Sequence, residues 1–535
     1  MRYYIDCNCR FGRTIQRDPL TAYEPQEMFR EMERCGIHAA VAENDYSVNY
    51  AYRQGNKELF ALSAENPRLY PLAMCPSTYK WEQREGEKYL HEICRQAKGI
   101  IIRPKTFSLS IDPRTMEQFV DVLIQENKPL VIPATELQFI DAGTSPLVTF
   151  LDAFPDLQVL LTDTNWGVQR MLFSVLERCN NLYFELSDNQ TNGILDIVKK
   201  YFGVDRVLFG SGYPKRSMGV IKSLIEYSGL SESDKDQVAH GNACRLFGIV
   251  ADKLEPYFGS KLDEIAATVD KGLPLDKWFV FDSHAHIADV DDDNITQLIM
   301  PLADMHSISS SMDKLGVDKI IFSAWEGIKI GGCRPNDTVY KAMTAYPEKM
   351  YGYVTANPNY DGDIDKAIND LETRGFVGLK PYAVLHGKLT DPGYIPWFEY
   401  GNRRKLFMLA HTGTQELAEQ VKQIAPLYPD MIFIMAHSGV SMEIARINVA
   451  VAKEFENIVL EITFTSATRG SIEYMVSEIG SERVLFGTDL PMRDSAPQLV
   501  WVAYAEIPVS DKINILGENM RKILDRILPP ENTNS

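Results

Sequence analysis

The sequence predicts an α/β protein made of two tandem (β/α)8 barrels of the TIM type. Short apolar segments alternate with helix-length segments along the chain, which is typical of βα units in a parallel sheet. Each half of the chain has eight such apolar segments, the number of strands in a closed barrel. With 535 residues, the chain is also too long for one ordinary hydrophobic core.

The first predicted barrel comprises residues 1–250. Its expected strands are Tyr3–Cys7, Ala39–Glu43, Leu69–Cys75, Gly99–Arg103, Leu130–Ala134, Val159–Asp163, Leu182–Leu186 and Val207–Ser211. Residues 251–276 follow, and apolar side chains such as Leu254, Phe258 and Leu262 recur there at helical spacing. We therefore expect a helical linker between the barrels.

The second predicted barrel comprises residues 277–528. Its expected strands are Phe279–Asp282, Lys319–Ser323, Met350–Thr355, Val377–Pro381, Leu406–His411, Ile432–His437, Ile458–Ile462 and Val484–Asp489. Helix-length segments separate these strands as they do in the first half, so we expect the same architecture twice.

The two halves can be aligned with each other along most of their length. Residues 205–211 (DRVLFGS) match residues 482–488 (ERVLFGT), and Asp6 matches Asp282. Counted from these aspartates, the later strand ends of the two halves agree to within two residues. Such regular spacing indicates a tandem duplication.

Metal-ligand types of side chain stand at four strand ends in the second half. His284 and His286 follow an apolar segment, and residues i and i+2 of a strand point to the same side. Three later strands end in His411, His437 and Asp489. Because the carboxyl ends of barrel strands surround one site, we expect these five side chains to meet there.

The first half lacks this set of residues. Asn8, Arg10, Ala134, Asp163 and Gly212 occupy the five corresponding positions. One carboxylate among them leaves a metal ion largely without ligands, so the first barrel is predicted to be a metal-free, degenerate copy. Its expected role is structural, and the alternative is a pocket for a small ligand that uses Arg10, Arg103 and Asp163.

The second half resembles the amidohydrolase superfamily. The motifs are His284-Ala285-His286, Ala410-His411-Thr412-Gly413, Ala436-His437-Ser438-Gly439 and residues 486–491 (FGTDLP). The similarity is greatest to the amidohydrolase-related branch, which includes the aminocarboxymuconate-semialdehyde decarboxylase group. It covers roughly residues 277–524.

The resemblance implies a single divalent metal ion, with zinc expected. Its implied ligands are His284, His286, His411 and Asp489, and His437 would lie beside the metal as a general acid or base. Asp489 would bind the ion or accept a proton from its water. Three histidines and a carboxylate suit zinc and also allow manganese, iron or cobalt.

Three cationic side chains are candidates for binding a substrate carboxylate. They are Lys380, Arg334 and Arg493, on loops expected at the same end of the barrel. Some members of the superfamily carry a carboxylated lysine that bridges two metals at the position of Lys380. The first half has Arg103 there, which favours a plain charge role for Lys380.

Three functions are compatible with these residues. The first is a metal-dependent hydrolase, in which activated water attacks an amide, ester or lactone of a small molecule. The second is a metal-dependent decarboxylase of an unsaturated or aromatic acid, which should have an arginine facing the metal. The third is a scaffold protein that retains the metal without turnover.

The composition argues against other classes of partner. A formal net charge of −18 disfavours nucleic acid, because binding phosphates requires a basic surface. No apolar run approaches the ~18–20 residues that span a bilayer, and no secretory signal is visible. The eight cysteines contain no CxxC pair and form no balanced disulfide framework. We expect a cytoplasmic protein with a small-molecule substrate, and a homo-oligomer is left open.

Overall fold

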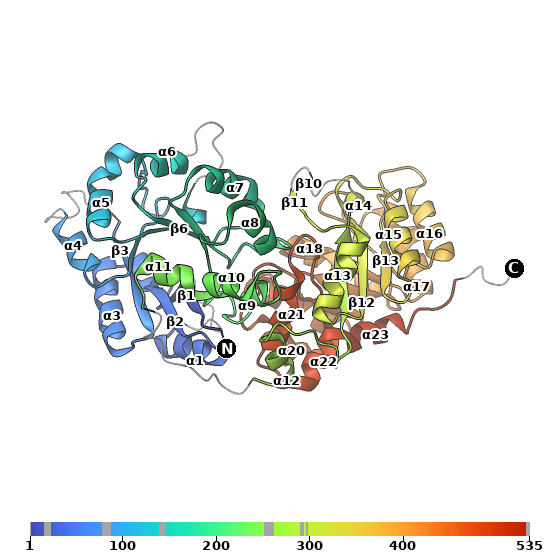
Figure 1. Cartoon of the computed structure of the whole chain (residues 1–535). Helices are drawn as coiled ribbons and strands as arrows, with labels where there is room; N and C mark the ends of the chain where they lie inside the picture. Colours follow the sequence, from blue (N-terminus) through green and yellow to red (C-terminus); the bar gives the residue numbers. More distant parts are fainter. Residues whose placement is uncertain are drawn as a thin grey trace. The chain divides into compact units, whose positions relative to one another are not determined.

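The computed structural model describes residues 2–14, 23–76, 87–137, 146–250, 262–288, 294–295 and 298–530. The chain forms two compact units, Met1–Leu262 and Asp263–Ser535. Each unit contains one sheet of eight parallel strands in sequential order. Helices surround the strands in each unit (Figure 1). The prediction of two tandem (β/α)8 barrels is therefore confirmed.

The first unit follows the βα alternation expected from its sequence. Its strands are β1 (Ile5–Phe11), β2 (Ala39–Asn44), β3 (Leu69–Met74), β4 (Gly99–Ile101), β5 (Leu130–Pro133), β6 (Val159–Thr162), β7 (Leu182–Glu185) and β8 (Val207–Leu208). Its helices are α1 (Pro25–Cys35), α2 (Asp45–Asn49), α3 (Tyr52–Glu65), α4 (Lys88–Cys94), α5 (Pro113–Gln125), α6 (Pro146–Ala153), α7 (Gln169–Arg178), α8 (Ile194–Phe202), α9 (Lys222–Glu226), α10 (Glu232–Asp236) and α11 (Asn242–Phe247).

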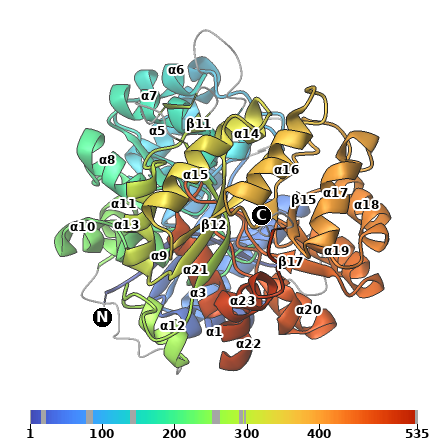
Figure 2. The same ribbon diagram turned by 90° about the vertical axis from the view of Figure 1, so that its right-hand side faces the viewer.

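The second unit repeats this order, and Figure 2 shows its helices around β12, β15 and β17. Its barrel strands are β9 (Phe281–Ile287), β12 (Lys319–Ala324), β13 (Met350–Val354), β14 (Gly378–Leu379), β15 (Phe407–His411), β16 (Ile432–Ala436), β17 (Ile458–Glu461) and β18 (Val484–Leu485). A separate antiparallel pair comprises β10 (Asn294–Ile295) and β11 (Leu298–Ile299). Its helices are α12 (Glu264–Val269), α13 (Met305–Leu315), α14 (Trp325–Lys329), α15 (Asn336–Ala345), α16 (Asp363–Thr373), α17 (Ile395–Arg403), α18 (Gln415–Ile424), α19 (Met442–Glu454), α20 (Ser471–Ile479), α21 (Ser495–Tyr504), α22 (Val509–Ile513) and α23 (Asn519–Leu524).

The first strand of each barrel lies beside the last. In the first unit Cys7 N donates to Phe209 O at 3.0 Å, and in the second Ser283 N donates to Phe486 O at 3.1 Å. These matching bonds bring the segment after the last strand against the start of the barrel. The residues that follow strand 8 therefore lie next to those of strand 1.

Each barrel also ends in the same way. Asn242 Nδ2 donates to two backbone carbonyls at 2.7 Å, and Asn519 Nδ2 makes the equivalent pair at 2.7 and 2.9 Å. A cis proline follows the last strand in both units, at Tyr213-Pro214 and Leu490-Pro491. The alignment of the two halves by sequence thus extends to individual hydrogen bonds.

The first strands are longer than the sequence suggested. β1 and β9 continue to Phe11 and Ile287, so His284 and His286 lie within β9 and not beyond its end. The register of β9 against β12 shifts once, between Ile320 and Phe322. Part of the predicted linker, 251–261, lies outside the described residues, and α12 occupies its later part.

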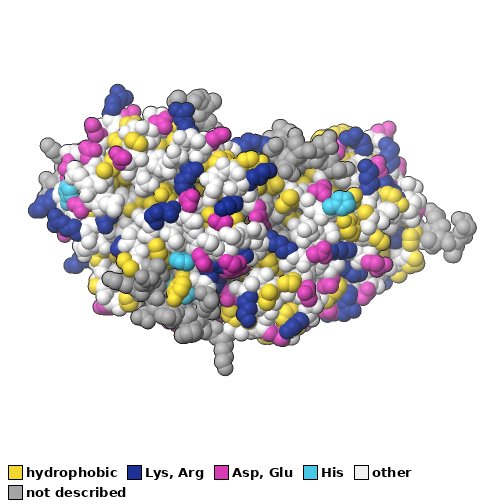
Figure 3. Space-filling view, viewed as in Figure 1, with side chains coloured by type: hydrophobic (Ala, Val, Ile, Leu, Met, Phe, Trp, Pro, Cys, Tyr) yellow, Lys and Arg dark blue, Asp and Glu magenta, His cyan; other side chains and the backbone are white. Residues whose placement is uncertain are grey.

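Surface charge and helix hydropathy concern two classes of partner, nucleic acid and membranes. On the face in Figure 3, acidic and basic side chains are interspersed without a continuous basic area. None of the helices in the described ranges combines the length and the hydropathy of a membrane span.

Candidate metal centre

Three predicted ligands of the second barrel lie together. His284 and His286 from β9 and Asp489 after β18 place their donor atoms within 4.8 Å of one another. Asp489 Oδ1 lies 2.9 Å from His286 Nε2 and 3.6 Å from His284 Nε2. At most 3% of each residue is exposed, so the group is screened from bulk water.

The remaining ring nitrogens of both histidines have partners. His284 Nδ1 lies 3.0 Å from Glu461 Oε2, and His286 Nδ1 lies 3.1 Å from Ser323 Oγ. These contacts fix the Nε2 atoms toward Asp489. Burial, with the nearby Lys380 amine, holds the pKa of both rings well below the usual value. The rings are therefore neutral, as metal binding requires.

His437 and His411 adjoin this group. The ring centroids of His437 and His284 are 5.0 Å apart, and those of His437 and His411 are 4.5 Å apart. His437 Nδ1 faces Thr463 O at 2.8 Å, which leaves Nε2 as the nitrogen available for proton transfer. His411 ends β15 but does not belong to a three-donor group among the described residues. Burial lowers its pKa to about 3.

Backbone conformation aims two of these side chains. His437 has φ of +64° and Asp489 has φ of +60°, a left-handed region that residues other than glycine seldom adopt. Asp489 N donates to His284 O at 2.7 Å, which ties the loop after β18 to β9. The strain of such residues is commonly found at functional sites.

Glu461 is a site residue that the sequence analysis missed. It ends β17, is fully buried, and contacts His284 Nδ1 and the backbone N of His437, the latter at 3.3 Å. Thr463 donates to it through both its backbone N, at 2.7 Å, and its hydroxyl. Burial raises the pKa of this carboxyl to about 7. The signal was available, because the first half has Glu185 at the matching position.

The three predicted substrate-binding cations differ in position. Lys380 Nζ lies 3.4 Å from His284 Nε2, and burial lowers the pKa of its amine to about 7. Arg493 is 2% exposed, contacts Asp489 and lies over the ring of Phe464 at 4.7 Å. The Arg334 side chain is 84% exposed and pairs with Glu326, so the structure does not bring it into this group.

The donor set fits a divalent metal ion. Neutral imidazoles and one carboxylate are typical ligands of zinc, and of manganese, iron or cobalt. Two of the imidazoles are anchored through Nδ1 by a carboxylate and a hydroxyl, the usual outer contacts of metal-binding histidines. His284, His286 and Asp489 would hold the ion. Among the described residues of the first unit, no such three-donor group is present.

Comparison with known proteins identifies the family. The family model described as Amidohydrolase matches residues 144–249 and 281–526, which is more than half of the chain. It covers part of the first barrel and nearly all of the second, in agreement with a duplication. No curated protein sequence matches the chain.

Several solved structures are similar to somewhat less than half of this chain. They include 5-carboxyvanillate decarboxylase from Novosphingobium aromaticivorans, with manganese (15% identity, TM-score 0.39, 47% of this chain and 97% of that chain). Another is dihydroxybenzoic acid decarboxylase from a Polaromonas species, with manganese (15%, 0.38, 46% and 97%). A third is 2,6-dihydroxybenzoate decarboxylase from Rhizobium (15%, 0.38, 46% and 99%). On the strength of the family match, this chain belongs to the amidohydrolase family.

Proposed function

We propose that the second barrel is a metal-dependent decarboxylase of a small unsaturated or aromatic carboxylic acid. The observation that carries this proposal is the position of Arg493, which is buried against Asp489 at the candidate metal centre. A decarboxylase of this kind needs a cation beside the metal to hold the carboxylate that leaves. Hydrolysis of a substrate that lacks a carboxylate gives Arg493 no comparable task.

The charges at the site also favour an acidic substrate. Lys380 and Arg493 are both buried there. Burial is the main cause of the lowered pKa values of His286, His411 and His437, and the positive charge of Arg493 lowers all three further. A divalent ion adds further positive charge to a site whose carboxylates are Asp489 and Glu461. An anionic substrate would balance this charge, and a guanidinium suits a carboxylate well.

The protein's own residues support each step of the reaction. A bound divalent ion, for which we propose zinc, would polarise a substrate oxygen. Arg493 and Lys380 hold the carboxylate. The bond from its carbon to the substrate breaks, CO2 departs, and the electron pair left on the substrate carbon takes up a proton. His437 Nε2 relays that proton: its Nδ1 keeps its own N–H on Thr463 O, so Nε2 first takes up a proton from a water molecule and then passes it to the substrate carbon.

Hydrolysis is the second candidate, and the same histidine favours it. The His437 ring is neutral, with Nε2 as its available nitrogen, so it is able to accept a proton from a water molecule. Asp489 provides a second acceptor beside it. Attack on an ester or lactone that also carries a carboxylate would use the same cations.

The test is an assay of metal-loaded protein on two substrate panels. One panel contains hydroxylated aromatic and unsaturated acids, with CO2 release as the readout, and the other contains lactones, esters and amides. We expect CO2 release that falls about 100-fold or more in Arg493→Gln, because a buried charged contact to the leaving carboxylate is lost. Arg334→Gln is the matched control and should retain full activity, since its side chain is exposed.

Each alternative has its own result. Turnover on the second panel alone would replace decarboxylation with hydrolysis. If CO2 release falls equally in Arg493→Gln and Arg334→Gln, Arg493 has no specific role in binding the substrate carboxylate. A protein that binds about one ion per chain but turns over neither panel would support the scaffold hypothesis.

A further inference from the structure

Three arginines converge at the mouth of the first barrel. Arg10 lies on β1, Arg103 follows β4 and Arg216 lies in the loop after β8. All three act on Asp163, which follows β6: burial opposes ionisation, but the guanidiniums of Arg10, Arg216 and Arg103 hold its pKa below the ordinary value. Arg10 and Arg103 also share one carboxylate oxygen, because Glu43 Oε1 lies 4.0 Å from Arg10 Nε and contacts Arg103 Nη2.

These positions are those of the metal centre in the second barrel. Arg10 pairs in register with Glu43 as His286 pairs with Ser323. Arg103 corresponds to Lys380 in the aligned halves. Arg216 corresponds to Arg493, because each lies two residues after the cis proline. The first barrel thus keeps two cations of the site and has a third where a metal ligand stood.

The guanidinium groups have donors that the described residues do not satisfy. Arg103 Nε and Arg216 Nε are buried without a hydrogen-bond partner, although Arg103 also pairs with Glu43 and Arg216 with Asp188. The nearest carboxylate oxygens to Arg10 lie at 3.7 Å, on Asp45, and at 4.0 Å, on Glu43. These distances exceed that of a hydrogen bond, and 32% of the Arg10 side chain is exposed.

Unsatisfied donors on buried cations are costly, so they point to a missing acceptor. A guanidinium presents its N–H groups as a planar fork that matches a carboxylate. Glu43, Asp45, Asp163 and Asp188 already face the three arginines, so a group with a single negative charge fits better than a doubly charged one.

We propose that the first barrel binds the carboxylate group of a small organic acid between Arg10, Arg103 and Arg216, without a metal ion. This site is separate from the centre in the second barrel and does not depend on the proposed decarboxylation. The proposal gives a binding role to a barrel for which the sequence predicts mainly a structural role.

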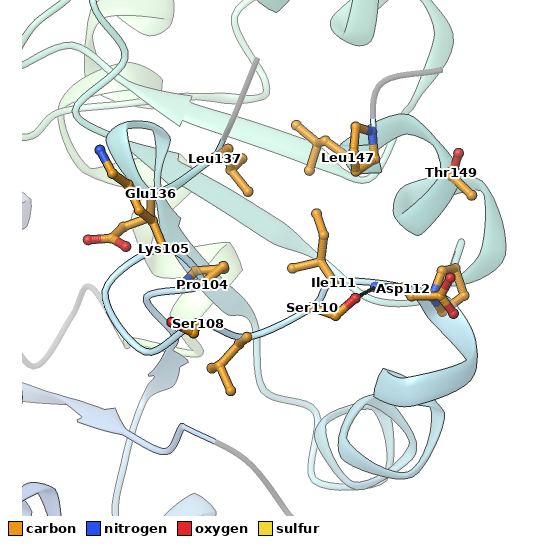
Figure 4. Close-up of a pocket in the computed structure, with 13 residues that line it drawn as sticks. Pro104, Lys105, Ser108, Ser110, Ile111, Asp112, Glu136, Leu137, Leu147 and Thr149 are labelled. Carbon is orange, nitrogen blue, oxygen red and sulfur yellow. Dashed lines mark hydrogen bonds between the residues drawn. The ribbon is translucent and has the colours of Figure 1, made fainter. Parts of the chain in front are cut away.

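A cavity of about 630 Å3 begins at Pro104, the residue after Arg103, although none of the three arginines lines it. Pro104 and Glu136 border it, and Glu136 lies 4.0 Å from Arg103. Ile111, Leu137 and Leu147 project into the space between the loop after β4 and α6 (Figure 4). An apolar body could extend in this direction from the carboxylate, which favours an acid with a ring or a short hydrocarbon chain.

The experiment is titration of the full-length, metal-free protein with 4-fluorobenzoate. Binding is measured by calorimetry and by 19F NMR. Arg10→Gln should weaken the binding at one site about tenfold or more, because the fork that faces the carboxylate is lost. Arg13→Gln is the matched control from the segment directly after β1, where the exposed Arg13 lies over Tyr23, and its binding should be unchanged. Arg10→Lys should be intermediate, since it keeps the charge without the fork.

Several results would overturn the proposal. One is wild-type protein that does not bind 4-fluorobenzoate, and another is Arg10→Gln protein that binds it as tightly as the wild type. Inorganic phosphate that binds more tightly than 4-fluorobenzoate, and is lost in Arg10→Gln, would replace the carboxylate with a phosphate. Melting curves show whether each variant is folded. If Arg10→Gln does not fold, the weaker binding expected of Arg10→Lys becomes the test.

Discussion

The role of Glu461 gives the sharpest prediction for the metal centre. One oxygen of its carboxylate faces His284 Nδ1 and His437 N, and the other faces Thr463 N and the Thr463 hydroxyl. In Glu461→Gln one of the two oxygens becomes an NH2 group, which is a hydrogen-bond donor. It then faces either His284 Nδ1 and His437 N or Thr463 N and the Thr463 hydroxyl, groups that donate to the carboxylate in the wild type. The imidazole of His284 then loses either its anchor or its orientation.

The size of the effect follows from these contacts. Losing the outer partner of a metal-binding histidine typically lowers metal affinity about 10–100-fold. That range corresponds to about 1.4–2.8 kcal/mol of binding free energy. We expect Glu461→Gln to fall within it, with the overall fold retained because the side chain keeps its size.

The assay is competition of the protein with a chelator for Co2+, followed by the visible absorption of the bound ion. The matched control is Glu185→Gln in the first barrel. Glu185 accepts from Asn8 Nδ2 at 3.0 Å and from Asp163 N at 2.7 Å, contacts like those of Glu461 but without a metal ligand. Equal affinities in wild type and Glu461→Gln, or equal losses in both variants, would refute the positioning role of Glu461.

Three further predictions use other residues. Elemental analysis should find about one ion per chain, and none in His284→Ala/His286→Ala, since both donors are removed; an ion that survives would place a second site elsewhere. Lys380→Met should retain that ion but reduce turnover at least about tenfold, because a cation beside His284 is lost. Two ions in the wild type that are both lost in His284→Ala/His286→Ala would instead indicate a carboxylated lysine. Burial raises the pKa of Glu185 from 4.5 to about 7, so the folded form holds an extra proton in this range and stability falls as the pH rises from 4.5 through 7. Melting temperatures across pH 4.5–8 should show a shallower decline in Glu185→Gln, and an unchanged profile would contradict this.

The sequence by itself determined the fold and most of the candidate site. Alternating apolar segments specify strands and helices, and parallel strands bring their carboxyl ends together, so strand-end residues meet whatever the loops do. This is why His284, His286 and Asp489 were identified without a structure, and why the losses at Asn8 and Arg10 were visible from the alignment.

The tertiary structure decided what depends on the path of loops and on burial. Arg334 and Arg493 are both arginines on loops, yet one is exposed beside Glu326 and the other is buried against Asp489. In the sequence, Glu461 is marked only by Glu185 at the matching position of the first half, because its importance comes from a hydrogen bond to a residue 177 positions away. Likewise, the unsatisfied donors of Arg103 and Arg216 arise only when folding removes them from water. Strand order follows from local sequence, whereas contacts between loops and between distant strand ends form only in the folded chain.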